Sequence, residues 1–71
     1  MARLERVRAG SLGKWRSVGE GVIELKIDFG PGYRVYVGID GRSVILLLAG
    51  EKSSQKADIK TAKDYWSDYN A

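Results

Sequence analysis

Charged and phenolic side chains alternate with apolar ones along two neighbouring segments in the middle of the chain. The first segment carries Glu24, Lys26 and Asp28, and the second carries Arg34 and Tyr36. Arginine and lysine can neutralise the charge that develops on a phosphate, and a tyrosine or lysine with a lowered pKa can transfer protons. These residues have the composition of a site that cleaves a phosphodiester or holds RNA.

A simpler interpretation stays open from the pattern alone. Asp28 and Arg34 can form a cross-strand ion pair on a solvated sheet, and an exposed pair of this kind contributes only about 0.2 to 1 kcal/mol to stability. The residue pattern by itself favours this structural interpretation over a catalytic one.

The amino-acid content limits the other chemistry that the chain can perform. Without histidine or cysteine, it cannot form a Ser-His-Asp or Cys-His arrangement, a disulfide, or a metal site built on those residues. No glycine-rich loop precedes a Lys-Ser/Thr pair at P-loop spacing, and the carboxylates alternate with basic residues instead of clustering. We expect neither nucleotide hydrolysis nor metal-assisted hydrolysis, and no cofactor.

Two strands and a tight loop are predicted to position the charged residues. Apolar residues at 23, 25, 27 and 29, and again at 33, 35, 37 and 39, follow the two-residue period of strands with one buried face. A three-residue loop, Gly30 to Gly32, keeps the apolar pairs together, and its glycines accept a positive φ. The predicted pairs are Asp28 with Arg34, Phe29 with Tyr33, Ile27 with Val35, and Lys26 with Tyr36.

A third strand is predicted to follow the Asp40-Gly41 turn, with Ile39 opposite Arg42. The run from Val44 to Ala49 is continuously apolar, which is typical of a strand covered on both faces. The result is an antiparallel meander with one dry face and one partly covered face, and the second face carries the candidate site.

A helix is expected at each end of the meander. Ala2 to Ala9 has the pattern of the last turns of a helix that stops at Gly10, and a turn-rich connector containing Leu12, Trp15 and Val18 follows. Near the C-terminus, an amphipathic stripe begins after a cap at Ser53 or Ser54 and comprises Ile59, Ala62, Trp66 and Tyr69.

We expect this stripe to pack on the face of Ile23, Leu25 and Ile27. The predicted fold class is α+β: a three-stranded antiparallel β-meander with a short N-terminal helix and a C-terminal amphipathic helix. At 71 residues, the chain is expected to form a single domain spanning residues 1–71.

The net charge of +3 comes entirely from the first 20 residues, where five basic residues stand against two acidic ones. Such a segment attracts nucleic acid or an acidic protein, although a solvated helix face has the same composition. Arg6 and Arg8 are candidate RNA-binding residues. No stretch has the length and apolarity of a signal peptide or a membrane span, so we expect a cytoplasmic protein without a membrane partner.

An ordered series of motifs covers most of the chain from about Leu4 onward. It comprises Glu24-Leu25-Lys26, Gly30-Pro31-Gly32-Tyr33-Arg34-Val35-Tyr36, Leu46-Leu47-Leu48, and Lys52-Ser53-Ser54-Gln55 with Asp58-Ile59 and Ala62. The series resembles the HigB-like addiction module killer protein branch of the RelE/ParE toxin superfamily. This resemblance implies the toxin of a type II toxin-antitoxin system and, as in RelE-like members, a metal-independent endoribonuclease that cleaves mRNA in the ribosomal A site.

The resemblance also implies roles for individual residues. Arg34 would bind the scissile phosphate, Lys26 would assist proton transfer or hold RNA, and Lys52 would support the RNA backbone, with further RNA contacts from Tyr36, Arg6 and Arg8. The chain departs from the family by lacking the usual N-terminal strand and first helix. The family's C-terminal tyrosine falls near Ile59, so no residue takes its role.

Two functions therefore remain open. The first is a ribosome-dependent mRNA interferase, whose partners are a cognate antitoxin protein, the ribosome and mRNA. The second is a non-catalytic, truncated toxin remnant that binds an antitoxin or itself. Self-association is expected when the antitoxin is absent, because a small truncated sheet exposes an edge strand, and Ile45, Leu47 and Ala49 share the face of Arg34 and Tyr36.

Overall fold

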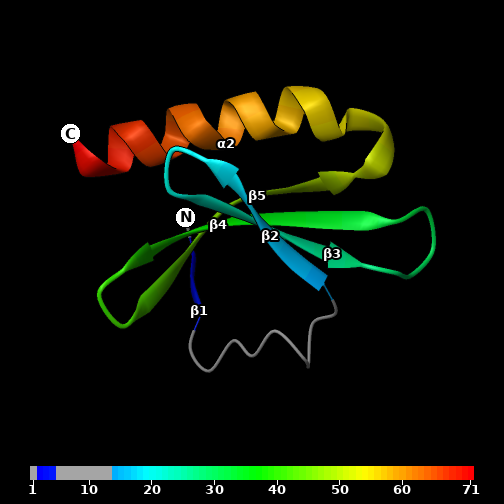
Figure 1. Ribbon diagram of the computed structural model, residues 1–71, viewed down its shortest axis with the longest axis horizontal. Helices are drawn as coiled ribbons and strands as arrows, with labels where there is room; N and C mark the ends of the chain where they lie inside the picture. Colours follow the sequence, from blue (N-terminus) through cyan, green and yellow to red (C-terminus); the bar gives the residue numbers. More distant parts are fainter. Residues whose placement is uncertain (1, 5–13) are drawn as a thin grey trace.

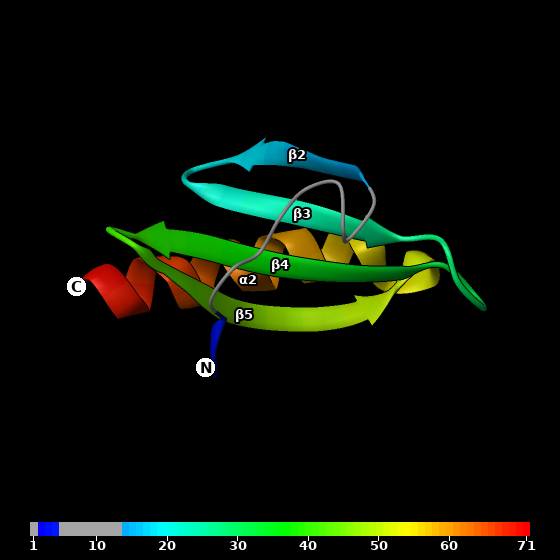
Figure 2. The ribbon, with the colours of Figure 1, turned by 90° about the horizontal axis from the view of Figure 1, so that it is seen from below.

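The computed structural model describes residues 2–4 and 14–71. In chain order, the elements are strands β1 (Ala2–Leu4), β2 (Lys14–Gly19), β3 (Val22–Ile27), β4 (Tyr33–Asp40) and β5 (Ser43–Glu51), the short 3-10 helix η1 (Lys52–Ser54) and helix α2 (Gln55–Asn70). The strands form one antiparallel sheet in the order β1-β5-β4-β3-β2. Helix α2 lies along one face of this sheet (Figures 1 and 2).

The predicted α+β class is confirmed, but two further strands extend the predicted meander. Residues Ala2–Leu4 pair with β5, so the helix predicted from Ala2 to Ala9 is wrong at its start, and its remainder lies outside the described residues. Lys14–Gly19, which was expected to be a connector, pairs with β3 as the edge strand β2. Its Trp and Val favour a strand, and a turn of three residues with positive φ, Gly19 to Gly21, returns the chain to β3.

The predicted register of the β3–β4 hairpin is wrong by two residues. Ile27 faces Tyr33 and Lys26 faces Arg34, so Asp28 does not face Arg34 but begins a five-residue loop. Two backbone hydrogen bonds, Gly32 N–H to Phe29 O at 3.1 Å and Phe29 N–H to Ile27 O at 2.9 Å, favour the longer loop. Because side chains alternate with a period of two, this shift leaves every strand residue on its predicted face.

The β4–β5 hairpin is also shifted by two residues from the prediction. Asp40 pairs with Ser43, so Gly41 and Arg42 form the turn and Ile39 faces Val44 instead of Arg42. Further along, Tyr36 pairs with Leu48 and Val37 with Leu46, which leaves a bulge at Leu47. The bulge allows both Leu47 and Leu48 to contact the core beneath α2.

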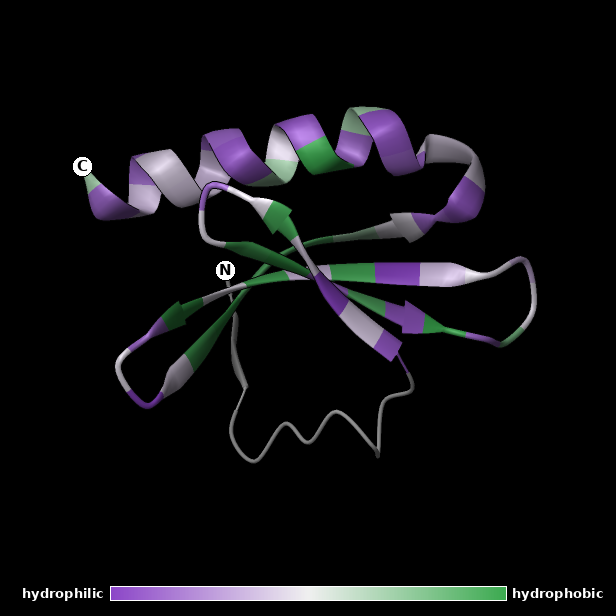
Figure 3. Ribbon diagram, in the orientation of Figure 1, coloured by the Kyte–Doolittle hydropathy of each residue, from purple (hydrophilic) through white to green (hydrophobic). Residues whose placement is uncertain are grey.

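Helix α2 covers the face opposite to the one predicted. Its Ile59, Ala62 and Trp66 pack with a buried cluster of sheet residues, Val22, Tyr36, Ile45 and Leu47, and not with the face of Ile23, Leu25 and Ile27. Gly38 gives room for this packing, since a Cβ atom there would overlap the Trp66 ring. Figure 3 shows that α2 is hydrophilic over most of its surface, in contrast to the hydrophobic stretches of the strands. No helix in the described ranges is long and apolar enough to cross a membrane.

Candidate functional site

Three basic residues lie in register on the adjacent strands β2, β3 and β4. Lys14 pairs with Lys26, and Lys26 pairs with Arg34. Side chains directly opposite each other on neighbouring strands are about 5 Å apart at Cβ, and like charges at such positions destabilise the sheet. We call Lys14, Lys26 and Arg34 the basic row. Its mutual repulsion would be relieved by an anion lying across the strands.

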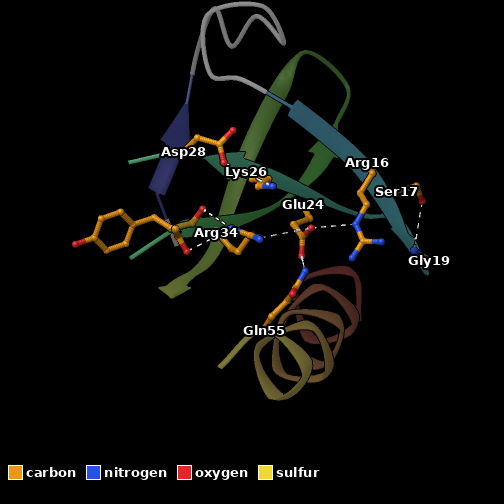
Figure 4. A network of polar contacts seen from close by, with 10 residues as sticks. Arg16, Ser17, Gly19, Glu24, Lys26, Asp28, Arg34 and Gln55 are labelled. Carbon is orange, nitrogen blue, oxygen red and sulfur yellow. Dashed lines mark hydrogen bonds and ion pairs between the residues drawn. The ribbon is translucent and has the colours of Figure 1, made fainter. Parts of the chain in front are cut away.

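The basic row lines an open groove of about 380 Å³ beside the first turn of α2. Among the described residues, four basic residues and one acidic residue line the groove, together with a tryptophan and a glutamine: Lys14, Arg16, Lys26, Arg34, Glu24, Trp15 and Gln55. Figure 4 shows Arg16, Glu24 and Arg34 directed toward one another across the strands, with Gln55 approaching from the helix. The groove is therefore strongly cationic and suited to a phosphate-bearing ligand.

Arg34 is held deep in this groove. Its side chain is only 5% exposed, and its Nη1 donates to the backbone carbonyls of Gly32 at 3.3 Å and Tyr33 at 3.4 Å. The Nε atom is buried and has no hydrogen-bond partner among the described residues. Its nearest anionic atom is Glu24 Oε1, at 4.0 Å. The guanidinium is thus oriented by the backbone, while its buried Nε–H has no acceptor among the described residues.

Glu24 is the acidic centre of the groove. Its carboxylate accepts hydrogen bonds from Arg16 Nε at 3.0 Å and from Gln55 Nε2 at 2.8 Å. Burial alone would raise the pKa of Glu24, but these two hydrogen bonds and the Arg16 charge outweigh it and hold the pKa below the ordinary value of 4.5. Glu24 is therefore an ionised counter-ion at neutral pH and unsuited to act as a proton donor there.

Lys52 lies at the Arg34 end of the groove. Its backbone N–H donates to Gly32 O at 2.8 Å. A Cβ atom built on Gly32 would lie 3.6 Å from Lys52 Cβ and 3.5 Å from Arg34 Nη1, so both residues surround the same glycine. The structure brings Lys26, Arg34 and Lys52, the three residues predicted from the family resemblance, to one end of the sheet.

Tyr36 does not fit the RNA-binding role predicted for it. It lies on the same face as Arg34, but α2 covers this part of β4 and the tyrosine is fully buried in the core. Burial and the neighbouring Glu24 charge raise the pKa of Tyr36 to about 12. A buried phenol of this kind can neither contact RNA nor transfer protons near neutral pH. The other predicted RNA contacts, Arg6 and Arg8, lie outside the described residues.

Sequence reasoning missed four lining residues of the groove as site residues: Lys14, Trp15, Arg16 and Gln55. The alternation of Lys14, Trp15, Arg16 and Ser17 carried a strand signal, but the flanking glycines favoured a connector instead. Gln55 carried no signal, because its contact with Glu24 joins residues 31 positions apart. Within residues 2–4 and 14–71, no group of three or more acidic residues is placed to hold a metal ion.

The chain is similar to an uncharacterised protein of Haemophilus influenzae. The two are 51% identical over 63 residues, which make up 87% of this chain and 64% of the relative. The chain thus spans less than two thirds of the relative's length. No family model matches the chain, and no solved structure gives a significant match.

Proposed function

We propose that the protein is the toxin component of a type II toxin-antitoxin system and cleaves mRNA on the ribosome. The observation that supports RNA binding best is the basic row, in which Lys14, Lys26 and Arg34 face one another on three adjacent strands. A polyanion is the ligand that such a row favours, because it neutralises charges that otherwise repel. The cleavage activity itself is proposed from the resemblance of the motifs to HigB-like toxins.

In this proposal, the RNA backbone runs across the strands along the basic row. Lys14 and Lys26 neutralise phosphates, and Lys26, which is partly exposed, can also assist proton transfer. Arg34 stabilises the charge that develops on the scissile phosphate, and two backbone carbonyls already fix the orientation of its Nη1. Lys52 supports the backbone at the same end of the groove.

The burial of Arg34 favours a second function. With its side chain only 5% exposed, Arg34 cannot reach a scissile phosphate unless neighbouring side chains in the groove move. A non-catalytic toxin remnant, which binds an antitoxin or itself through the retained sheet, requires no such movement. Under this alternative the groove holds an acidic segment of a partner without chemistry.

Induced expression in a bacterium separates the two functions. We expect the wild-type protein to arrest growth and Arg34→Ala to abolish the arrest, because stabilising the developing charge requires a cation at that position. Arg42→Ala is the matched control: it removes the same charge from the exposed turn at the far end of β4 and should leave the arrest intact. Ribosome-bound mRNA from the same cultures should show cleavage only when growth stops.

The remaining outcomes decide against parts of the proposal. No arrest by the soluble, folded wild-type protein would favour the non-catalytic remnant. Arrest by Arg34→Ala, or equal loss of arrest in both variants, would remove Arg34 from the active site. Because Arg34 is buried, circular dichroism of each purified variant must first show the wild-type fold.

A further inference from the structure

One carboxylate oxygen lies between two arginines that come from the strands on either side of β3. Glu24 Oε1 accepts a hydrogen bond from Arg16 Nε of β2 at 3.0 Å and lies 4.0 Å from Arg34 Nε of β4. Figure 4 shows both interactions as dashed lines converging on the Glu24 carboxylate. The position of Oε1 is therefore one where two guanidinium groups meet an anionic oxygen.

Glu24 forms a hydrogen bond with only one of these two arginines, Arg16. A separation of 4.0 Å is too long for a hydrogen bond, and Arg34 Nε is buried without another acceptor among the described residues. Buried donors in native proteins are rarely left unpaired, and an exception calls for a ligand or an unseen partner. Arg34 lines the groove, whose volume of about 380 Å³ leaves room for a phosphate beside the unpaired Nε.

The two sides of the Glu24 carboxylate are bound by different elements. Oε1 meets Arg16, whose side chain is 62% exposed on the edge strand, whereas Oε2 accepts from Gln55 of α2. Arg16 can therefore move to another anion while Glu24 keeps its hydrogen bond to Gln55. Arg16 engages Glu24 through Nε alone, which leaves the two terminal nitrogens for a second acceptor.

We propose that Arg16 and Arg34 form a second phosphate subsite, which shares Arg34 with the basic row, and that the Glu24 carboxylate occupies this subsite when RNA is absent. A phosphodiester would enter from the open groove, accept from Arg34 Nε and Arg16, and displace Glu24 from Arg16. Glu24 thereby competes with RNA for the same two arginines. The ligand class rests on the proposed function, whereas the competition concerns anion binding and is independent of cleavage.

Neutralising Glu24 tests the competition. The probe is a fluorescently labelled, single-stranded oligouridylate of about six nucleotides, and its affinity is measured by anisotropy at several salt concentrations. We expect Glu24→Gln to bind at least about fivefold more tightly than wild type, because like-charge juxtaposition in the site is removed. Asp64→Asn is the matched control, since it removes one exposed carboxylate from the outer face of α2 and should change affinity less than about twofold.

Arg16 provides a second test that does not disturb a buried residue. Arg16→Gln should weaken binding by about tenfold and flatten the log-log salt dependence by about 0.7, the contribution of one phosphate contact on a single strand. The control Arg42→Gln removes the same charge from the far turn and should leave the slope unchanged.

The results separate this inference from the proposed function. If Glu24→Gln binds no more tightly than Asp64→Asn, or if Arg16→Gln behaves like Arg42→Gln, the subsite does not exist. If Glu24→Gln fails to fold, the comparison of Arg16→Gln with its control Arg42→Gln alone decides whether the subsite exists. If both pairs behave as expected but ribosomal mRNA stays intact in growth assays, the anion subsite stands and the toxin proposal falls.

Discussion

Tyr36 follows Arg34 by two residues on the same face of β4, yet the two side chains have different environments. Arg34 reaches the groove, while Tyr36 is covered by α2 and its hydroxyl lacks a hydrogen-bond partner among the described residues. The residue types alone made both candidates for RNA binding. Both residues are buried, but Arg34 lines the groove, whereas Tyr36 belongs to the core cluster beneath the helix.

Replacing Tyr36 with phenylalanine is expected to be neutral or stabilising at neutral pH, because the deleted hydroxyl makes no hydrogen bond to any described residue. At high pH the free energies of unfolding of wild type and Tyr36→Phe should diverge. A pKa raised from 10.0 to about 12 by folding contributes stability that is complete below pH 10.0 and is lost as the pH rises through about 12. Wild type should therefore lose about 2 to 3 kcal/mol relative to Tyr36→Phe over that range.

Urea unfolding at a series of pH values measures both effects. If Tyr36→Phe lowered the free energy of unfolding at neutral pH by more than about 1.5 kcal/mol, the hydroxyl would have to donate a hydrogen bond, with the nearby Glu24 as its natural acceptor. If the free energy of unfolding fell equally with rising pH in the two proteins, folding would not shift the pKa of the Tyr36 phenol.

At the scale of elements, the β3–β4 register changes the chemistry of the sheet. The alternation of apolar residues predicted which side chains share a face, but a slip of two residues preserves that alternation and cannot be recognised from it. The predicted register gave a neutral Asp28–Arg34 pair. The observed register places Lys26 against Arg34 and adds Lys14 beyond, which forms a row of like charges, while Asp28 forms its ion pair with Lys26 at 3.6 Å instead.

The choice of sheet face by α2 also escaped prediction, for a steric reason. Both faces of β3 and β4 carry apolar residues, and the sequence pattern predicts the more strictly alternating face as the core. The helix instead lies where Gly38 and Gly21 leave space for the Trp66 indole. Glycines within strands mark such close approaches, but the partner that approaches is not visible in the pattern.

Gly38→Ala should lower the free energy of unfolding by about 1 to 3 kcal/mol, because the new methyl group overlaps the Trp66 ring. Combining it with Trp66→Leu should cost less than the two single changes together, by at least about 0.5 kcal/mol. Gly41→Ala is the control: a Cβ atom there meets nothing within 4 Å, so its cost comes only from a φ of 59°.

Thermal or urea unfolding of the four proteins in this cycle gives the coupling energy directly. Additive losses for Gly38→Ala and Trp66→Leu would mean that the indole does not rest on β4. Coupling between Gly41→Ala and Trp66→Leu would point to a general loosening of the fold instead of a local contact.

At the scale of the whole molecule, the sheet ends in the exposed edge strand β2. Five of its six residues are exposed, including Trp15, and no strand in the described part of the chain pairs with its outer side. An exposed edge is a template for pairing with another strand. Self-association without an antitoxin therefore remains our prediction for the protein at high micromolar concentration.

Light scattering of wild type and variants tests whether the protein self-associates and whether the contact is made through β2. Trp15→Lys should reduce it, because a lysine on an edge strand opposes strand pairing. Phe29→Lys, an equal change at an exposed aromatic in the β3–β4 loop, should have less effect if pairing occurs through β2. A monomeric wild-type protein would contradict the prediction, and a larger effect of Phe29→Lys would move the contact to the loop.

The hydrogen bond from Gln55 to Glu24 has a thermodynamic consequence for the whole domain. It joins the first turn of α2 to the one acidic residue that lines the groove within residues 2–4 and 14–71, so the position of the helix and the electrostatic potential of the groove are not independent. An anion that strengthens or weakens the Gln55–Glu24 hydrogen bond also changes the free energy with which α2 docks. By reciprocity, a partner that binds α2 alters the affinity of the groove for anions by the same factor.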